Sequence, residues 1–242
     1  MNVLPCGESG VVATLFHELA DRRDANSLLE GIQSRTRFPY ISAATFRVFR
    51  SEMLLDVNFN KLGQSSAIML IDTGSQRISV FVQVKTSTKG PWSIEEEFQR
   101  FLDGPGAVGY ASNLFSELYA KHRLVKGLAS VGIKGLQEGL SFPPSASGKT
   151  VRKLGNNPIT FKALERIRDY LDDSFFVAVV PEEGESLARF FDQILRDAAP
   201  QGFDDWDVRH WGFLSWQEVR KFSTVNRLDR TRNALDLNKS LF

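Results

Sequence analysis

A polar pair ends the most regular apolar segment of this sequence. From Ile78 to Val84 every second residue is aliphatic, whereas Gln83 and Lys85 fall on the alternate positions. Because successive side chains of a strand point to opposite faces, Gln83 and Lys85 are predicted to lie side by side at its C-terminal end. A buried ammonium is costly unless it is paired or hydrated, so an acidic group is expected beside Lys85.

Two aspartates are candidates for that acid. Asp72 begins the tight connection that leads into this strand, and it reaches Lys85 only if the strands are offset or another strand intervenes. Asp56 lies on a separate expected strand, from Met53 to Phe59. The spacing leaves both alternatives open.

A third carboxylate comes from the first expected helix, Ser9 to Asp21. Glu8 points in the direction of the apolar stripe that includes Val12 and Leu15, and hence toward the sheet on which the helix packs. The alternative is that Glu8 is solvated in the first turn, where its charge complements the helix dipole.

The order of strand-like and helix-like segments around these residues predicts an α/β fold. We expect a central mixed β-sheet flanked by helices, with a C-terminal helical elaboration. Apolar runs predict further strands, and helical periodicity predicts further helices. The expected strands are Phe46–Phe49, Ala67–Ile71 and Phe175–Val180, and the expected helices are Leu28–Ile32, Ile94–Leu102, Ser112–Leu124, Ile159–Leu171 and Ser186–Asp197. The Pro- and Ser-rich stretch from Ser141 to Pro158 is expected to be irregular, and Trp211–Trp216 to close the core.

The composition narrows the function classes. The chain has 242 residues with a formal net charge of +1, so a polyanion site requires local clustering of basic residues. One cysteine excludes an internal disulfide framework and multi-cysteine metal sites, and three scattered histidines argue against a histidine-built site. With no membrane-length apolar run and no signal-peptide pattern, a cytoplasmic protein is expected.

The Gln83-x-Lys85 strand ending, the acidic candidates before it and the helix glutamate together resemble the PD-(D/E)XK nuclease superfamily, in the Gln-x-Lys variant of Mrr-type restriction and anti-phage nucleases. The resemblance covers residues 8–88 and implies a restriction-endonuclease-like core. It places Glu8, Asp72 (or Asp56), Gln83 and Lys85 at the catalytic positions. Glu8, Asp56, Asp72 and Gln83 become the candidate ligands of Mg²⁺ or Mn²⁺, and Lys85 serves the attacking water.

The resemblance implies a divalent-metal-dependent endonuclease that hydrolyses DNA in bacterial restriction or phage defence, acting as a homodimer or within a larger defence complex. The sequence departs from the family pattern because no Pro-Asp pair precedes the acid, and Ser65 and Ser66 stand where an acid would open the strand Ala67–Ile71. The alternative prediction is a catalytically inactive nuclease fold that binds nucleic acid or a protein partner.

Basic residues cluster in two regions, which predicts contacts with phosphates. The alternative is that both clusters are solvated surface. Residues 1–222 are predicted to form a single nuclease-like domain, and 223–242 a basic polar tail. The predicted nucleic-acid-binding residues are Lys149, Arg152 and Lys153 in the irregular segment and Arg227, Arg230 and Arg232 at the C-terminal end.

The run Ser147–Thr150 resembles the end of a phosphate-binding P-loop. The Walker pattern requires a glycine five residues before Gly148, where this chain has Pro143. Proline lacks an N–H and fixes φ, so nucleotide hydrolysis is not expected at this segment.

Overall fold

A computed structural model describes residues 7–22, 50–86, 92–103, 113–145, 148–181, 184–190 and 210–239. The predicted helix Leu28–Ile32 and the predicted strand Phe46–Phe49 lie outside the described residues. No helix within the described ranges is long and apolar enough to cross a membrane.

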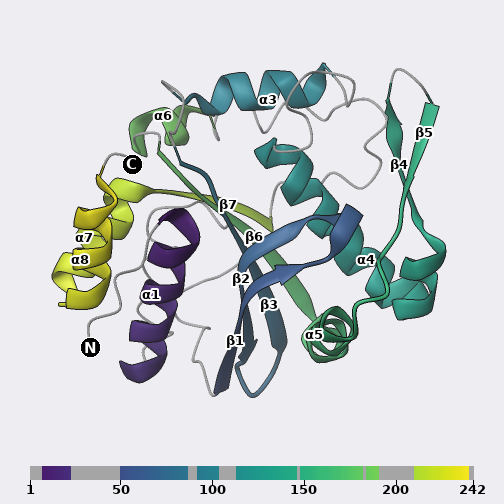
Figure 1. The fold of residues 1–242 in the computed structure, drawn as a ribbon, viewed down its shortest axis with the longest axis horizontal. Helices are drawn as coiled ribbons and strands as arrows, with labels where there is room; N and C mark the ends of the chain where they lie inside the picture. The colour runs from purple at the N-terminus through teal and green to yellow at the C-terminus, as the bar shows by residue number, and fades with distance from the viewer. Residues whose placement is uncertain are drawn as a thin grey trace.

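A five-stranded mixed sheet forms the centre of the fold, in the order β1-β2-β3-β6-β7 (Figure 1). The first three strands form an antiparallel meander, and β6 and β7 then continue the sheet in parallel with β3. The α/β prediction is therefore confirmed. The strands are β1 (Arg50–Asn58), β2 (Gln64–Asp72), β3 (Arg77–Val84), β6 (Asp173–Val180) and β7 (Trp211–Ser215).

The alternation of β3 divides the interior into two hydrophobic cores, one on each face of the sheet. Val80, Val82 and Val84 face the core that contains the apolar side of α1. Phe81 faces the other core, which contains Phe115 of α4. Both faces of β3 are therefore buried, as the near-continuous apolar texture of this strand requires.

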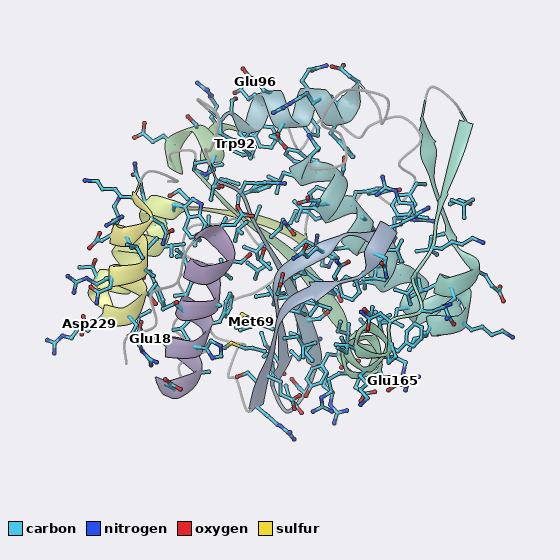
Figure 2. All side chains as sticks on the ribbon, viewed as in Figure 1. Glu18, Met69, Trp92, Glu96, Glu165 and Asp229 are labelled. Carbon is cyan, nitrogen blue, oxygen red and sulfur yellow. The ribbon has the colours of Figure 1, made fainter. Side chains whose placement is uncertain are left out.

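Helices cover both faces of the sheet (Figure 1). On one face lie α1 (Gly7–Arg22), α7 (Trp216–Val225) and α8 (Asp229–Leu237), and Met69 of β2 projects toward this layer (Figure 2). The opposite core contains residues of α3 (Ile94–Leu102), α4 (Leu114–Glu138), α5 (Pro158–Arg168) and α6 (Gly184–Arg189). A 3₁₀ turn, η1 (Asn60–Leu62), connects β1 to β2.

The predicted irregular segment Ser141–Pro158 is largely an antiparallel hairpin, of β4 (Leu140–Ser145) and β5 (Gly148–Arg152). The prediction was wrong because the prolines of β4 lie where its pairing is interrupted, between Phe142 and Ser145. A proline is tolerated at such an irregularity, since no ladder hydrogen bond from its nitrogen is needed there. Gly148 opens a strand and not a helix, unlike the glycine of a P-loop.

The predicted C-terminal tail is also corrected, because residues 223–239 include the end of α7 and all of α8. Glu18 of α1, which is 3 % exposed, accepts hydrogen bonds from the backbone N–H of Arg230 and from both the N–H and the hydroxyl of Thr231. At the other end of these helices, the Asn238 side chain accepts a 2.8 Å hydrogen bond from Gly7 N. The first and last described helices are thus fastened to each other at both ends.

Glu18→Ala should lower the free energy of unfolding by about 1–3 kcal/mol, because it leaves buried N–H groups at the start of α8 without an acceptor. Denaturant unfolding measures the effect. The matched control is Asp21→Asn on the same helix, which removes an exposed, solvent-screened ion pair with Arg230 and should cost clearly less than Glu18→Ala. Equal losses in the two variants would contradict the capping role of Glu18.

Candidate functional site

The backbone at the end of β3 is fixed by its neighbours on two sides. Lys85 N donates to Val179 O of β6 at 2.8 Å, and Lys85 O accepts from Trp216 Nε1 of α7 at 2.7 Å. Gln83 and Lys85 share the parity of Phe81, which places them on the face covered by α4. The end of β3 that carries Gln83 and Lys85 is therefore held by hydrogen bonds to both β6 and α7.

The acid that meets Lys85 is Glu117 of α4, which sequence analysis did not single out. Lys85 Nζ lies 3.1 Å from Glu117 Oε2, and the two side chains are 17 % and 19 % exposed. The start of α4 is fixed by Asn113, whose side chain accepts from Phe115 N and Ser116 N, and by Glu97, which accepts from Leu114 N. Glu117 is thus held in the first turn of a well-capped helix.

A second lysine lies one helical turn further along α4. Lys121 is fully buried, and its Nζ donates to the carbonyl oxygen of Glu117 at 3.2 Å. Burial lowers the pKa of Lys121 to about 8, although the charge of Glu117 opposes the shift. Burial likewise raises the pKa of the Glu117 carboxyl, against the opposing effect of Lys85 and Lys121. Glu117 and Lys121 therefore each favour the charged form of the other against the effect of burial.

Glu8 approaches the same end of the sheet from the opposite face. The Thr86 hydroxyl donates to Glu8 Oε2 at 3.1 Å, which ties the start of α1 to the residue that follows Lys85. Glu8 is also close enough for its negative charge to contribute to the raised pKa of Glu117. The half-buried Glu8 carboxylate thus faces the tip of the sheet and not bulk solvent.

Gln83 presents an unsatisfied oxygen to this region. Its side chain is 8 % exposed, and Oε1 is buried with no hydrogen-bond partner among the described residues. Glu117 Oε2 is also buried, but the Lys85 ammonium lies 3.1 Å from it and compensates its charge. A buried oxygen without a donor, such as Gln83 Oε1, is costly and marks a place where a ligand would be favourable.

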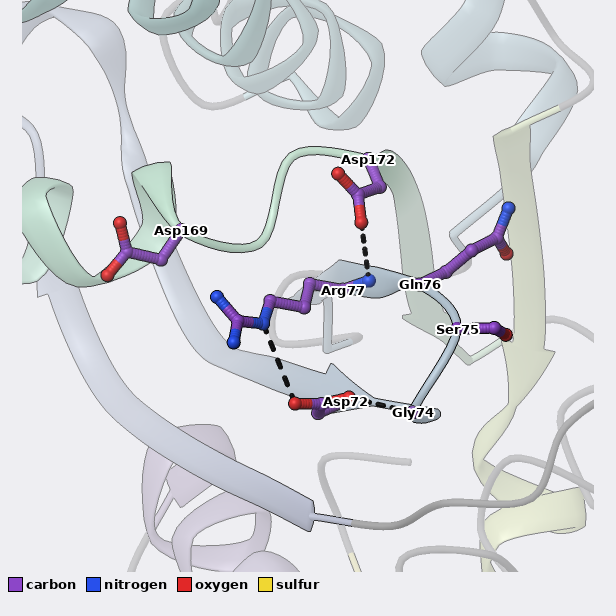
Figure 3. A pocket seen from close by; sticks show the side chains of 7 residues that line it. All are labelled: Asp72, Gly74, Ser75, Gln76, Arg77, Asp169 and Asp172. Atoms are coloured by element: carbon purple, nitrogen blue, oxygen red, sulfur yellow. Dashed lines mark hydrogen bonds and ion pairs between the residues drawn. The ribbon is translucent and has the colours of Figure 1, made fainter.

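Asp72 does not belong to this site. In the register of β2 with β3, Asp72 pairs with Arg77 at the start of β3, so the length of the strand separates it from Lys85. Its carboxylate accepts from Gly74 N and forms a 3.5 Å ion pair with Arg77, beside Asp172 (Figure 3). The assignment of Asp72 as a catalytic and metal-binding residue is therefore corrected: a direct hairpin brings it to the wrong end of the strand.

Asp56 is at the correct end of the sheet but on the wrong strand. The β1–β2 and β2–β3 registers place it two strands, about 10 Å, from Gln83. Its backbone has a φ of 52°, and its carboxylate accepts a hydrogen bond from Gln64. Asp56 is therefore engaged with the β1–β2 connection and is not part of the Lys85 cluster.

The predicted phosphate-binding residues form two separate groups (Figure 1). Arg152 and Lys153 belong to the β5 region, beyond α4, whereas the C-terminal group belongs to the α7–α8 layer. Arg230 pairs with Asp21, and Arg232 pairs with Asp229. Arg227 occupies the turn between α7 and α8, and the side chain of Lys149 is not described. One continuous nucleic-acid surface does not join these residues.

The donor set at the tip of the sheet fits a hard divalent cation in part. The described residues contain no group of three His, Cys, Asp or Glu side chains that could hold a metal ion. Glu8 and Glu117 nevertheless supply two carboxylates, and the unsatisfied Gln83 Oε1 supplies an amide oxygen. Carboxylate and amide oxygens are the ligands that Mg²⁺ accepts, usually with several waters retained.

A sequence signal for Glu117 and Lys121 does exist. Both fall on the apolar stripe of the predicted helix Ser112–Leu124, among Leu114, Leu118 and Leu124. An acid and a base four residues apart on a buried stripe are expected to pair or to meet charges from a facing element.

Comparison with protein-family models, with curated proteins and with solved structures gave no match.

The buried lysine predicts a pH dependence of stability. Between about pH 8 and the unfolded value of 10.5, the unfolded chain binds the Lys121 proton more tightly than the native protein does. The free energy of unfolding should therefore rise with pH across this window, by up to about 3 kcal/mol. Below pH 8 the lysine is charged in both states and contributes no slope.

Denaturant unfolding from pH 7 to 10.5 tests this prediction by comparing the wild type with Lys121→Met. The variant should lose the rise that Lys121 causes. The matched control is Lys134→Met, an exposed lysine further along α4, beyond its kink at Gly132, which should leave the slope unchanged. Parallel curves for the wild type and Lys121→Met would contradict the dependence.

Proposed function

We propose that this protein is a divalent-metal-dependent nuclease whose active site is the cluster at the tip of the sheet formed by Glu8, Gln83, Lys85 and Glu117. The observation that supports it most is the unsatisfied Gln83 oxygen beside an ammonium–carboxylate pair, at the position implied by the resemblance to PD-(D/E)XK nucleases. Glu117 supplies from α4 the carboxylate that Ser65 and Ser66 do not supply from β2.

Glu8, Glu117 and Gln83 would hold Mg²⁺ or Mn²⁺, and the bound ion supplies charge neutralisation of the phosphate and a more acidic water. The weaker amide ligand predicts modest metal affinity. Lys85 stabilises negative charge on the attacking water and on the phosphate. Lys121 has a different role, because it is fully buried and holds the Glu117 side of the cluster in place.

The proposed substrate is DNA, and the proposed setting is bacterial restriction or phage defence. Both rest on the resemblance of the Gln83-x-Lys85 strand and the helix glutamate. One active site cuts one strand at a time, so double-strand cleavage would use a homodimer or a partner in a larger defence complex. A cytoplasmic location accompanies this setting.

Cleavage of supercoiled plasmid tests the activity. The wild type should nick it with Mg²⁺ or Mn²⁺ and not with EDTA, and Lys85→Met should reduce the rate at least about 100-fold because it removes the ammonium from the reacting groups. Glu117→Gln should raise the metal concentration required. The control Lys134→Met, on an exposed turn of α4, should retain the wild-type rate. Equal rates in Lys85→Met and the wild type would refute the assignment.

A catalytically inactive nuclease fold is the second candidate. It is favoured by Ser65 and Ser66 at the start of β2 and by the incomplete set of carboxylates among the described residues. In that case the protein shifts the mobility of DNA, or binds a protein partner, without cutting DNA at any concentration of Mg²⁺ or Mn²⁺. The same plasmid assay, read as retardation with and without nicking, separates the two candidates.

A further inference from the structure

A cavity of about 360 Å³ opens directly beside Glu117. Three parts of the chain that are distant in sequence enclose it: the η1 turn between β1 and β2, the first turns of α4, and the β5 strand. The volume lies within the range of sites that enclose a small organic group, about 300–1,000 Å³. The lining that matters here comprises Asn60, Lys61, Ser116, Ala120, Val151 and Arg152.

Arg152 lines this cavity and carries a planar cationic group. Its guanidinium carbon lies 4.5 Å from the centre of the Phe142 ring, so the buried aromatic ring of β4 supports the cationic group. A guanidinium plane backed by a ring is a surface on which a nucleobase stacks. The hairpin of β4 and β5 therefore supplies more than a positive charge, which a lysine could equally supply.

The lining also offers polar groups for the edge of a base. Asn60, with a φ of 57° at the start of η1, carries an amide with both donor and acceptor atoms, and the Ser116 hydroxyl, which donates to Asn113 Oδ1 at 3.4 Å, retains its capacity to accept. Lys61 supplies a cation for a backbone phosphate next to the bound nucleotide. Gly63 has a φ of 95°, which favours glycine, and it also lines the cavity.

We propose that this cavity binds one unstacked nucleobase, so that the preferred substrate is single-stranded or locally unpaired nucleic acid and not regular duplex. The inference rests on the proposed nuclease function, because Glu117 is both a wall of the cavity and the partner of Lys85. A base seated against Arg152 positions its own phosphodiester near Lys85. A duplex stack keeps its bases out of the cavity unless one is flipped out.

Fluorescence anisotropy in EDTA tests the base site without cleavage. The probes are a single-stranded oligonucleotide, its duplex and the same single strand made abasic throughout. The wild type should bind the single strand at least about tenfold more tightly than the duplex or the abasic strand. Equal affinity for all three, or no binding to any of them, would overturn the proposal. A preference for the intact single strand without nicking of any substrate in Mg²⁺ would refute only the nuclease activity.

Two variants locate the site. Ala120→Leu fills the cavity from α4 and should remove the preference for the intact single strand, whereas the control Ala129→Leu, exposed on the same helix, should keep it. Arg152→Lys retains the charge, loses the plane and should reduce the preference several-fold even if Ala120→Leu fails to fold. Thermal unfolding of each variant establishes that it is folded. If both variants fold and both keep the preference for the intact single strand, the assignment to this cavity is contradicted. If Ala120→Leu does not fold, an unchanged preference in Arg152→Lys alone contradicts it.

Discussion

The ion pair between Lys85 and Glu117 is the interaction on which the candidate site depends. A lysine at the end of a strand covered on both faces would lose much of its hydration, and the carboxylate from α4 compensates for that loss. The position of Glu117 in turn depends on Asn113 and Glu97, which cap the start of α4. These caps hold the Glu117 carboxylate beside the Lys85 ammonium. Lys121 adds a second positive charge behind it and keeps the net charge of the cluster near balance.

The parts of the fold that follow from local pattern were predictable from the sequence. The alternation from Ile78 to Val84 predicts a strand, and the structure confirms it as β3, with Lys85 N continuing the pairing to β6. The acid was not predictable in the same way. Asp72 ends the strand that precedes β3. A tight hairpin places the end of one strand beside the beginning of the next, so Asp72 lies beside Arg77 and not beside Lys85. Glu117 arrives from another layer, and its contact with Lys85 follows from tertiary packing.

Two other differences have the same physical origin. Composition suggested an irregular segment from Ser141 to Pro158, yet pairing between β4 and β5 accommodates its prolines at a local interruption. The charge of residues 223–242 suggested a tail, yet Ala234 and Leu235 are buried against α1 and Glu18 caps the helix. In both cases contacts with a partner element outweigh what the local composition indicates.

The hydrogen bond from Gly7 to Asn238 joins residues 231 positions apart, and it lies at the end of α1 that carries Glu8. Contacts between such distant positions form slowly, because the loop between them must close before they contribute stability. During synthesis, Glu8 leaves the ribosome first, but the helix that clamps α1 leaves among the last of the described residues. The clamp on the end of α1 that carries Glu8 therefore forms only after translation has passed Asn238, and a shorter nascent chain lacks it.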